Sequence, residues 1–138
     1  MIYYVCFWFR NPFGLKLWNW GFWRDIWGWR RNGPQFYHLS VFFNDEGTWV
    51  HVNCDRSALR IVTIPDEQFA DFLTDISAVT KILAVKEGDQ SRFLLRGWFT
   101  CVTATKHMIG RGGSALSPNG LWDRLISEDA EIINGNHA

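Results

Sequence analysis

Cysteine and histidine are the residue types in this 138-residue chain whose placement could support nucleophilic chemistry. Cys101 follows Trp98-Phe99-Thr100 and begins a stretch with helical character. At the start of a helix, free backbone N–H groups and the helix dipole favour a thiolate. A nucleophilic cysteine also needs an imidazole within hydrogen-bond reach to accept its proton. Cys101 is therefore the candidate nucleophile; the alternative is a small buried apolar residue, the commonest fate of a free cysteine.

Two histidines, His38 and His51, fall on consecutive predicted strands that one hairpin turn connects. Centring this turn on Asp45 and Glu46 places His51 near Ser40, from which its side chain could reach His38 diagonally across one face of the sheet. Such a pair suits a relay in which one imidazole orients the other. The alternative is two unrelated, half-exposed histidines.

A metal site is another use of these side chains. His38, His51, Cys54 and Cys101 could form a zinc set, but the sequence has no CxxC or HxxxH spacing, so neither a metal nor a cofactor is expected. The chain has three cysteines, and Cys6, the third, is not close in sequence to the other two. A disulfide framework is therefore not expected, and a reducing compartment is favoured.

Hydrophobic periodicity predicts an α+β domain with a central antiparallel sheet. A single domain is expected over residues 1–130, followed by a frayed tail over residues 131–138. Strands are predicted over Ile2–Phe9, Phe36–Phe43, Thr48–Asn53, Leu59–Ile64 and Val79–Val85, and helices over Trp18–Arg31, Asp66–Ser77, Thr100–Ile109 and Ser117–Ile126.

Charge and tryptophan are unevenly distributed along the chain. Basic residues and six of the nine tryptophans lie near the start and acidic residues near the end, although the formal net charge is +0. Zero net charge argues against a general nucleic-acid coat. The predicted helix Trp18–Arg31 has a wide apolar arc, which indicates packing against the sheet. The alternative is a binding surface for a membrane interface, a protein or single-stranded nucleic acid.

The order of several short motifs carries a family resemblance. Phe36-Tyr37-His38-Leu39-Ser40-Val41 falls on a strand, Thr100-Cys101-Val102-Thr103-Ala104-Thr105-Lys106 opens a helix, and Ser117-Pro118-Asn119-Gly120-Leu121-Trp122 opens another. This order resembles the circularly permuted papain-like hydrolases, which include NlpC-like peptidases and lecithin:retinol acyltransferases. The short bacterial and bacteriophage members are the most similar. In this group the histidine strand precedes the cysteine helix.

The resemblance implies roles for individual residues. Cys101 would be the nucleophile and His38 its general base. His51 would be the third, orienting residue. Asn53 is the substitute for that role, since Asn serves in Cys-His-Asn sites. The backbone N–H of Cys101 would bind the oxyanion.

The function expected from this resemblance is a thiol-dependent hydrolase or acyltransferase that cleaves an amide or ester bond. A peptide bond of peptidoglycan is the first substrate expected, lipid acyl groups the second, and isopeptide-linked protein tags the third. The alternative is a non-catalytic structural or binding module, such as a virion component. The first ten residues lack the features of a signal peptide, and no apolar run is long enough to span a bilayer. A cytoplasmic or virion-associated location is therefore expected.

Overall fold

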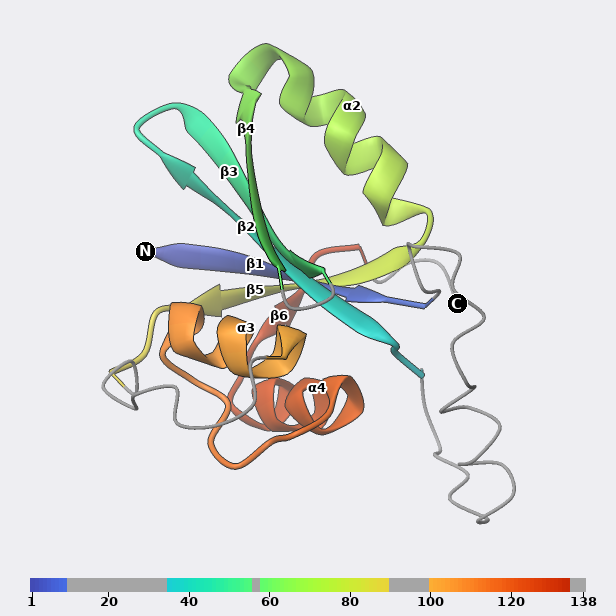
Figure 1. The fold of residues 1–138 in the computed structure, drawn as a ribbon, viewed down its shortest axis with the longest axis vertical. Helices are drawn as coiled ribbons and strands as arrows, with labels where there is room; N and C mark the ends of the chain where they lie inside the picture. Colours follow the sequence, from blue (N-terminus) through green and yellow to red (C-terminus); the bar gives the residue numbers. More distant parts are fainter. Residues whose placement is uncertain (10–34, 56–57, 90–99, 135–138) are drawn as a thin grey trace.

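The computed structural model describes residues 1–9, 35–55, 58–89 and 100–134. In these residues six strands form one antiparallel sheet and three helices pack on it, which confirms the predicted α+β class (Figure 1). None of these helices is long and apolar enough to cross a membrane. The predicted helix Trp18–Arg31 lies outside the described residues. The elements are β1 (Ile2–Trp8), β2 (His38–Asp45), β3 (Thr48–Asp55), β4 (Ala58–Pro65), α2 (Asp66–Ser77), β5 (Thr80–Lys86), α3 (Cys101–Ile109), α4 (Pro118–Ser127) and β6 (Glu131–Ile132).

The sheet has the strand order β4-β3-β2-β1-β5-β6, so β1 has a neighbour on each side. Side chains of β1 pack into the core on each face of the sheet, which explains its apolar sequence, because a strand buried on both faces is predominantly apolar. Val5, Cys6 and Phe7 are completely buried at its centre. Figure 1 shows α2 on one face of the sheet and α3 and α4 on the other.

Two hydrophobic cores lie on the two faces, because successive side chains of a strand point to opposite sides. On the α2 face, Cys6, Phe42, Ile76 and Ile82 form one buried cluster. The α3 and α4 face has a larger cluster, which contains Val5, Phe7, Phe36, Leu39, Val41, Leu83, Val85, Val102, Ile109, Leu121, Trp122 and Leu125. The buried side chains of β1 and β2 therefore alternate along each strand between these two cores.

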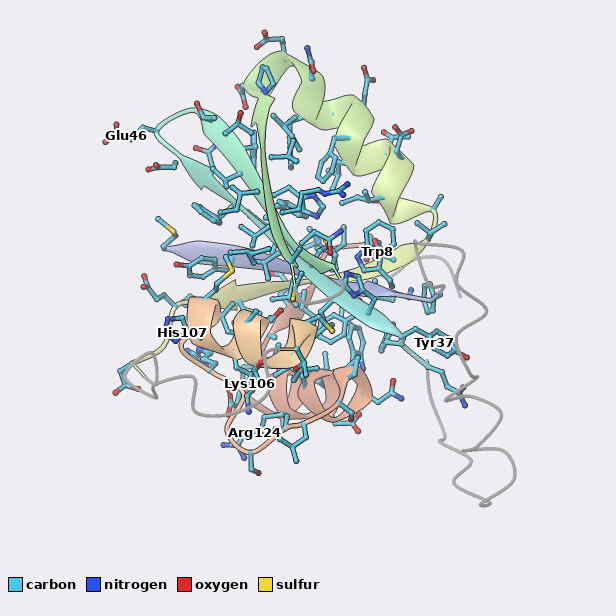
Figure 2. All side chains as sticks on the ribbon, in the orientation of Figure 1. Trp8, Tyr37, Glu46, Lys106, His107 and Arg124 are labelled. Carbon is cyan, nitrogen blue, oxygen red and sulfur yellow. The ribbon has the colours of Figure 1, made fainter. Side chains whose placement is uncertain are left out.

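The hairpin between β2 and β3 closes with a two-residue loop. Asp45 pairs with Thr48, and the loop residues Glu46 and Gly47 have φ angles of 48° and 90°. Positive φ at both positions is the signature of a type I′ turn, which favours glycine at the second. The Asn44 side chain accepts a hydrogen bond from the Gly47 N–H at 3.0 Å. Glu46 lies at the tip of this hairpin (Figure 2).

The turn is therefore centred one residue later than the sequence analysis predicted, and the register of β3 differs by two residues. Ser40 pairs with Asn53, and Phe42 pairs with His51. The prediction that His51 lies near Ser40 is wrong, because the turn takes glycine as its second residue. A shift of two residues keeps His51 and Asn53 on the expected face but exchanges their positions along the strand.

Helix α3 begins and ends with strong capping signals. Thr100 accepts a hydrogen bond from the Thr103 N–H, and the Thr103 hydroxyl accepts one from the Thr100 N–H, so the two form a capping box. At the other end Gly110 is left-handed, with φ of 64°, and its N–H donates to the Lys106 carbonyl. These contacts define the first turn, which carries Cys101.

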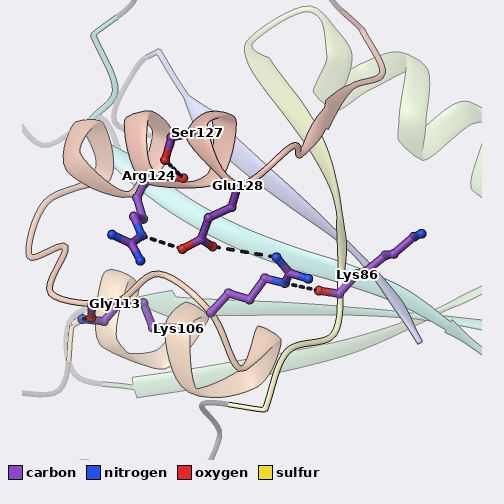
Figure 3. Close-up of polar contacts among 7 residues, drawn as sticks. Lys86, Lys106, Gly113, Arg124, Ser127 and Glu128 are labelled. Carbon is purple, nitrogen blue, oxygen red and sulfur yellow. Dashed lines mark hydrogen bonds and ion pairs between the residues drawn. The ribbon is translucent and has the colours of Figure 1, made fainter.

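Polar contacts fix the connection between α3 and α4 against the sheet (Figure 3). The Glu128 carboxylate accepts a 2.5 Å hydrogen bond from Arg124 and lies 3.9 Å from the Arg111 guanidinium. Arg111 also donates to the Lys86 carbonyl of β5 at 2.7 Å. The Lys106 ammonium donates to two carbonyls of the loop between α3 and α4, at 2.9 and 2.8 Å. Through Arg111 and Glu128, this network ties α4 and the loop before it to the end of β5.

The tail that was expected to be frayed from Glu131 is ordered as far as the described residues extend. Glu131 and Ile132 form β6, which pairs with β5. The Asn134 side chain accepts a hydrogen bond from the Ile82 N–H at 2.7 Å and donates one to the Thr80 carbonyl at 2.8 Å. A two-residue strand carries no periodic pattern, so the sequence did not indicate it.

Candidate active site

A histidine–asparagine pair lies at the start of β2. The Nε2–H of His38 donates a hydrogen bond to Oδ1 of Asn53 at 2.5 Å. His38 is the first residue of β2 and is only 8% exposed. Because Asn53 pairs with Ser40, the contact runs diagonally between the strands. A proton on Nε2 leaves the Nδ1 lone pair as the basic atom of this imidazole.

Trp8 and Ser40 support this pair from the centre of the sheet. Trp8 is the cross-strand partner of His38 in β1, and its indole N–H donates to the Ser40 hydroxyl at 2.9 Å. Figure 2 labels Trp8 beside β1. Because cross-strand partners project from the same face of a sheet, the Trp8 and His38 side chains lie on the same side.

Cys101 lies at the same end of β2 as His38, at the first position of α3. The β2–β3 ladder ends at the pair of Ser40 with Asn53. Leu39, directly before Ser40 in the chain, lies outside this ladder. Its N–H group is directed at the Cys101 sulfur. The N–H groups of Val102 and of Cys101 itself are also directed at the sulfur. The thiol is therefore adjacent to the backbone of the residue that follows His38.

His38 and Cys101 approach this point from different sides of the sheet. The His38 ring lies with Asn53 on the α2 side, whereas Cys101 packs against the core on the α3 side. Both lie near the last rung of the β2–β3 ladder, where Leu39 separates His38 from Ser40 and directs its N–H at the Cys101 sulfur. The structure thus brings His38 and Asn53 into direct contact and places the thiol beside the same stretch of backbone.

Burial raises the pKa of the Cys101 thiol, and the nearby Cys54 thiol adds to this effect. The Leu39 N–H is the strongest influence in the opposite direction, followed by the N–H groups of the first helical turn. Burial has the largest effect, so the resting thiol is protonated at neutral pH. A nucleophilic role therefore requires a base that removes the proton.

His51 does not make the hydrogen bond that was expected of it. Its ring packs against Phe72 of α2 at 5.2 Å between centroids, and its buried Nε2 has no hydrogen-bond partner among the described residues. Burial, and then the charge of His38, lowers the pKa of His51 to about 4. It is therefore neutral at pH 7. The partner of His38 Nε2 is Asn53, the second of the two residues considered for this position.

The residues considered for a zinc set do not converge. Cys54 shares the α3 side with Val52, which pairs with Val41 in the core beneath α3. His51 lies on the α2 side, against Phe72. Within the described ranges, no group of three or more His, Cys, Asp or Glu side chains could hold a metal ion.

Asn119 is a positioning residue that the sequence analysis did not identify. It lies in the first turn of α4, is 6% exposed, and its Oδ1 accepts a hydrogen bond from the Phe36 N–H at 2.8 Å. This contact fixes the chain two residues before His38. An asparagine near a helix start usually acts as a cap, so its position alone gave no signal for a contact so distant in the sequence.

Comparison with known proteins gives no relative of this chain. No family model, curated protein or solved structure matches it. The geometry of the site and the order of the motifs are therefore the basis for the functional proposal.

Proposed function

We propose that this chain is a thiol-dependent hydrolase or acyltransferase with a permuted papain-like fold. Cys101 acts as the nucleophile, His38 as the general base and Asn53 as the orienting residue. The observation that carries the proposal is the 2.5 Å hydrogen bond from His38 Nε2 to Asn53, together with a cysteine at the start of α3 whose sulfur faces the N–H of the next residue, Leu39. A base held by a third group next to a nucleophile is the arrangement that covalent catalysis requires.

Proton transfer starts the reaction. Because burial keeps the resting thiol protonated, His38 Nδ1 takes the proton as the sulfur attacks the carbonyl carbon of the substrate. The His38 imidazolium then keeps its Nε2–H on Asn53, which prevents the ring from rotating. Negative charge develops on the carbonyl oxygen, and the N–H groups of Cys101 and Val102 at the helix start stabilise it.

Collapse of the tetrahedral intermediate forms an acyl thioester on Cys101. The bond to the leaving group breaks, and His38 returns its proton to the departing amine or alcohol. A water molecule, or an acceptor hydroxyl or amine, then attacks the thioester with His38 as base. This step releases the acyl product and restores the Cys101 thiol.

The substrate class follows from the family resemblance. A peptide bond of peptidoglycan is the first candidate, an acyl lipid the second and an isopeptide-linked protein the third. All three present a carbonyl carbon to the thiol, so one acyl-enzyme chemistry serves each. A location in the cytoplasm or in a virion is part of the same proposal.

An activated ester tests the proposal without knowledge of the substrate. Folded protein is incubated with p-nitrophenyl acetate, and acetylated peptides are identified by mass spectrometry. We expect a hydroxylamine-sensitive acetyl group on Cys101 and its strong reduction in His38→Ala. Acetylation of Cys101 at the same rate in both proteins, or none in the wild type, contradicts the proposal.

A non-catalytic binding module is the second candidate, and the outer strand β4 favours it. In β4 the side chains of Leu59, Ile61 and Val62 are 49%, 60% and 45% exposed. Edge strands usually carry charges or other features that prevent pairing, so an apolar edge favours a partner strand. A protein that is not acetylated but captures an extended peptide along β4 would support this candidate.

A further inference from the structure

The Cys54 side chain lies on the same side of the sheet as Cys101. Cys54 comes two residues after Val52, whose side chain is buried on the α3 side of β3. By the alternation of a strand, Cys54 faces the same way. Figure 1 shows α3 on the face opposite α2, and α3 contacts both β2 and β3. Neither cysteine is in a disulfide, and both are partly exposed.

Leu39 provides a common reference point for the two sulfurs. Its N–H is directed at Cys101, while continuation of the β2–β3 register past Ser40 and Asn53 would bring Cys54 opposite Leu39. The β2–β3 ladder ends one rung earlier, and at this point the Leu39 N–H faces the first residue of α3. The electrostatic effect of Cys54 on the Cys101 pKa agrees with this proximity.

We propose that Cys54 is a resolving cysteine that forms a reversible disulfide with Cys101 under oxidation by a peroxide. The inference deepens the proposed function, because it makes the nucleophile of that site redox-regulated. Cys6 cannot take this role, since it is fully buried on the α2 face and burial raises its pKa to about 12.

The oxidation proceeds in two balanced steps. The Cys101 thiolate, formed when His38 takes its proton, attacks one oxygen of hydrogen peroxide, giving a sulfenic acid and one water. The Cys54 sulfur then attacks the Cys101 sulfur, forming the S–S bond and releasing the hydroxyl as a second water. Two thiols lose two electrons, and one peroxide is reduced. A dithiol restores both thiols by exchange.

The disulfide would inactivate Cys101 reversibly and also protect it from irreversible oxidation. A sulfenic acid without a nearby thiol is open to further oxidation to the sulfinic acid, which a dithiol does not reverse. With Cys54 in place, the sulfenic acid is captured first. Acylation of Cys101 therefore stops on oxidation and returns on reduction.

Peptide mapping of the oxidised monomer tests the pairing. Wild type and Cys54→Ser are treated with an excess of hydrogen peroxide, blocked with N-ethylmaleimide and digested without reductant. We expect a linked Cys54–Cys101 peptide in the wild type and sulfinic Cys101 in Cys54→Ser. A wild type without the linked peptide, in which Cys101 is either untouched or sulfinic, overturns the proposal. Circular dichroism confirms that both proteins are folded.

The same samples separate this inference from the proposed function. After oxidation and again after dithiothreitol, the acetylation of Cys101 by p-nitrophenyl acetate is measured. If the linked peptide forms in a protein that is never acetylated, the disulfide stands and the hydrolase proposal fails. If acetylation depends on His38 but no linked peptide forms, the hydrolase proposal stands and the disulfide fails.

Discussion

His38 Nε2 lies 2.5 Å from Asn53 Oδ1, and this bond joins β2 and β3 on a diagonal at the last rung of their ladder. Cys101 lies near the same place, because the N–H of Leu39, the residue between His38 and Ser40, is directed at its sulfur. A register shifted by two residues would have put His51 in the position of Asn53. The relation between the two residues is therefore set by the turn at Glu46 and Gly47.

Replacement of Asn53 should impair acylation more than replacement of His51. Asn53→Ala removes the hydrogen bond that holds the His38 ring, and a bond worth about 1 to 1.5 kcal/mol corresponds to about a tenfold slower acetylation of Cys101. His51→Gln leaves that bond in place. Stopped-flow release of p-nitrophenol measures both rates. Equal loss in the two variants would assign the orienting role to the wrong residue.

The stability of the fold should fall between pH 6.5 and pH 4 because of His51. Its pKa is lowered from 6.5 to about 4 in the folded protein, so the unfolded chain binds the proton more tightly. Its contribution to the free energy of unfolding is complete above pH 6.5 and is lost as the pH falls to about 4. The total loss is about 3 kcal/mol.

Urea unfolding at several pH values checks this dependence. His51→Gln should flatten the acid limb of the stability curve by about 3 kcal/mol. His107→Gln is the matched control, because His107 is exposed near the end of α3 (Figure 2). An acid limb that is the same in His51→Gln and in the wild type would show that another group causes it.

Much of the fold could be predicted from local signals. The helix Asp66–Ser77 has the predicted bounds, and α3 and α4 each begin one residue after the start of the predicted helix. These boundaries depend on short stretches of sequence, in which a hydroxyl cap or a glycine in the left-handed region has a direct energetic effect.

The site depended on geometry that local patterns do not specify. To predict the contact of His38 with Asn53, one must know which two residues form the hairpin turn. Asp45-Glu46 and Glu46-Gly47 are both plausible in this run of turn-forming residues. The contact of Asn119 with the Phe36 N–H joins residues far apart in the sequence. Tertiary packing determines such contacts, so the hydrophobic periodicity of the sequence does not predict them.

Removal of the α3 cap should affect both stability and Cys101. Thr100→Ala loses the 3.1 Å hydrogen bond from the Thr103 N–H, which costs about 1 kcal/mol of folding free energy. It also loosens the first turn, so acetylation of Cys101 slows. Ser117→Ala removes the equivalent 3.0 Å bond from the Gly120 N–H in α4 and is the matched control. It should lose similar stability with a smaller effect on acetylation, because this turn carries Asn119 rather than Cys101.

Gly110 should tolerate alanine less well than Gly47. Both have positive φ, so each substitution costs about 1 kcal/mol of backbone strain. A Cβ at Gly47 meets nothing within 4 Å, whereas a Cβ at Gly110 collides with the Gly88 carbonyl. Gly110→Ala should therefore be the less stable variant in urea. Equal losses would show that β5 and the end of α3 can separate at little cost.

The pH dependence of Cys101 alkylation tests the central claim, which is that His38 accepts the proton of Cys101. The rate with iodoacetamide is measured in a Cys6→Ser/Cys54→Ser background, with His38 intact or replaced by alanine. We expect alkylation at neutral pH that depends on His38. The alanine variant should react only above the ordinary thiol range of ~8.5, because burial raises the pKa of the isolated thiol. Identical profiles in two folded proteins would contradict the Cys101–His38 pair and with it the proposed catalytic function.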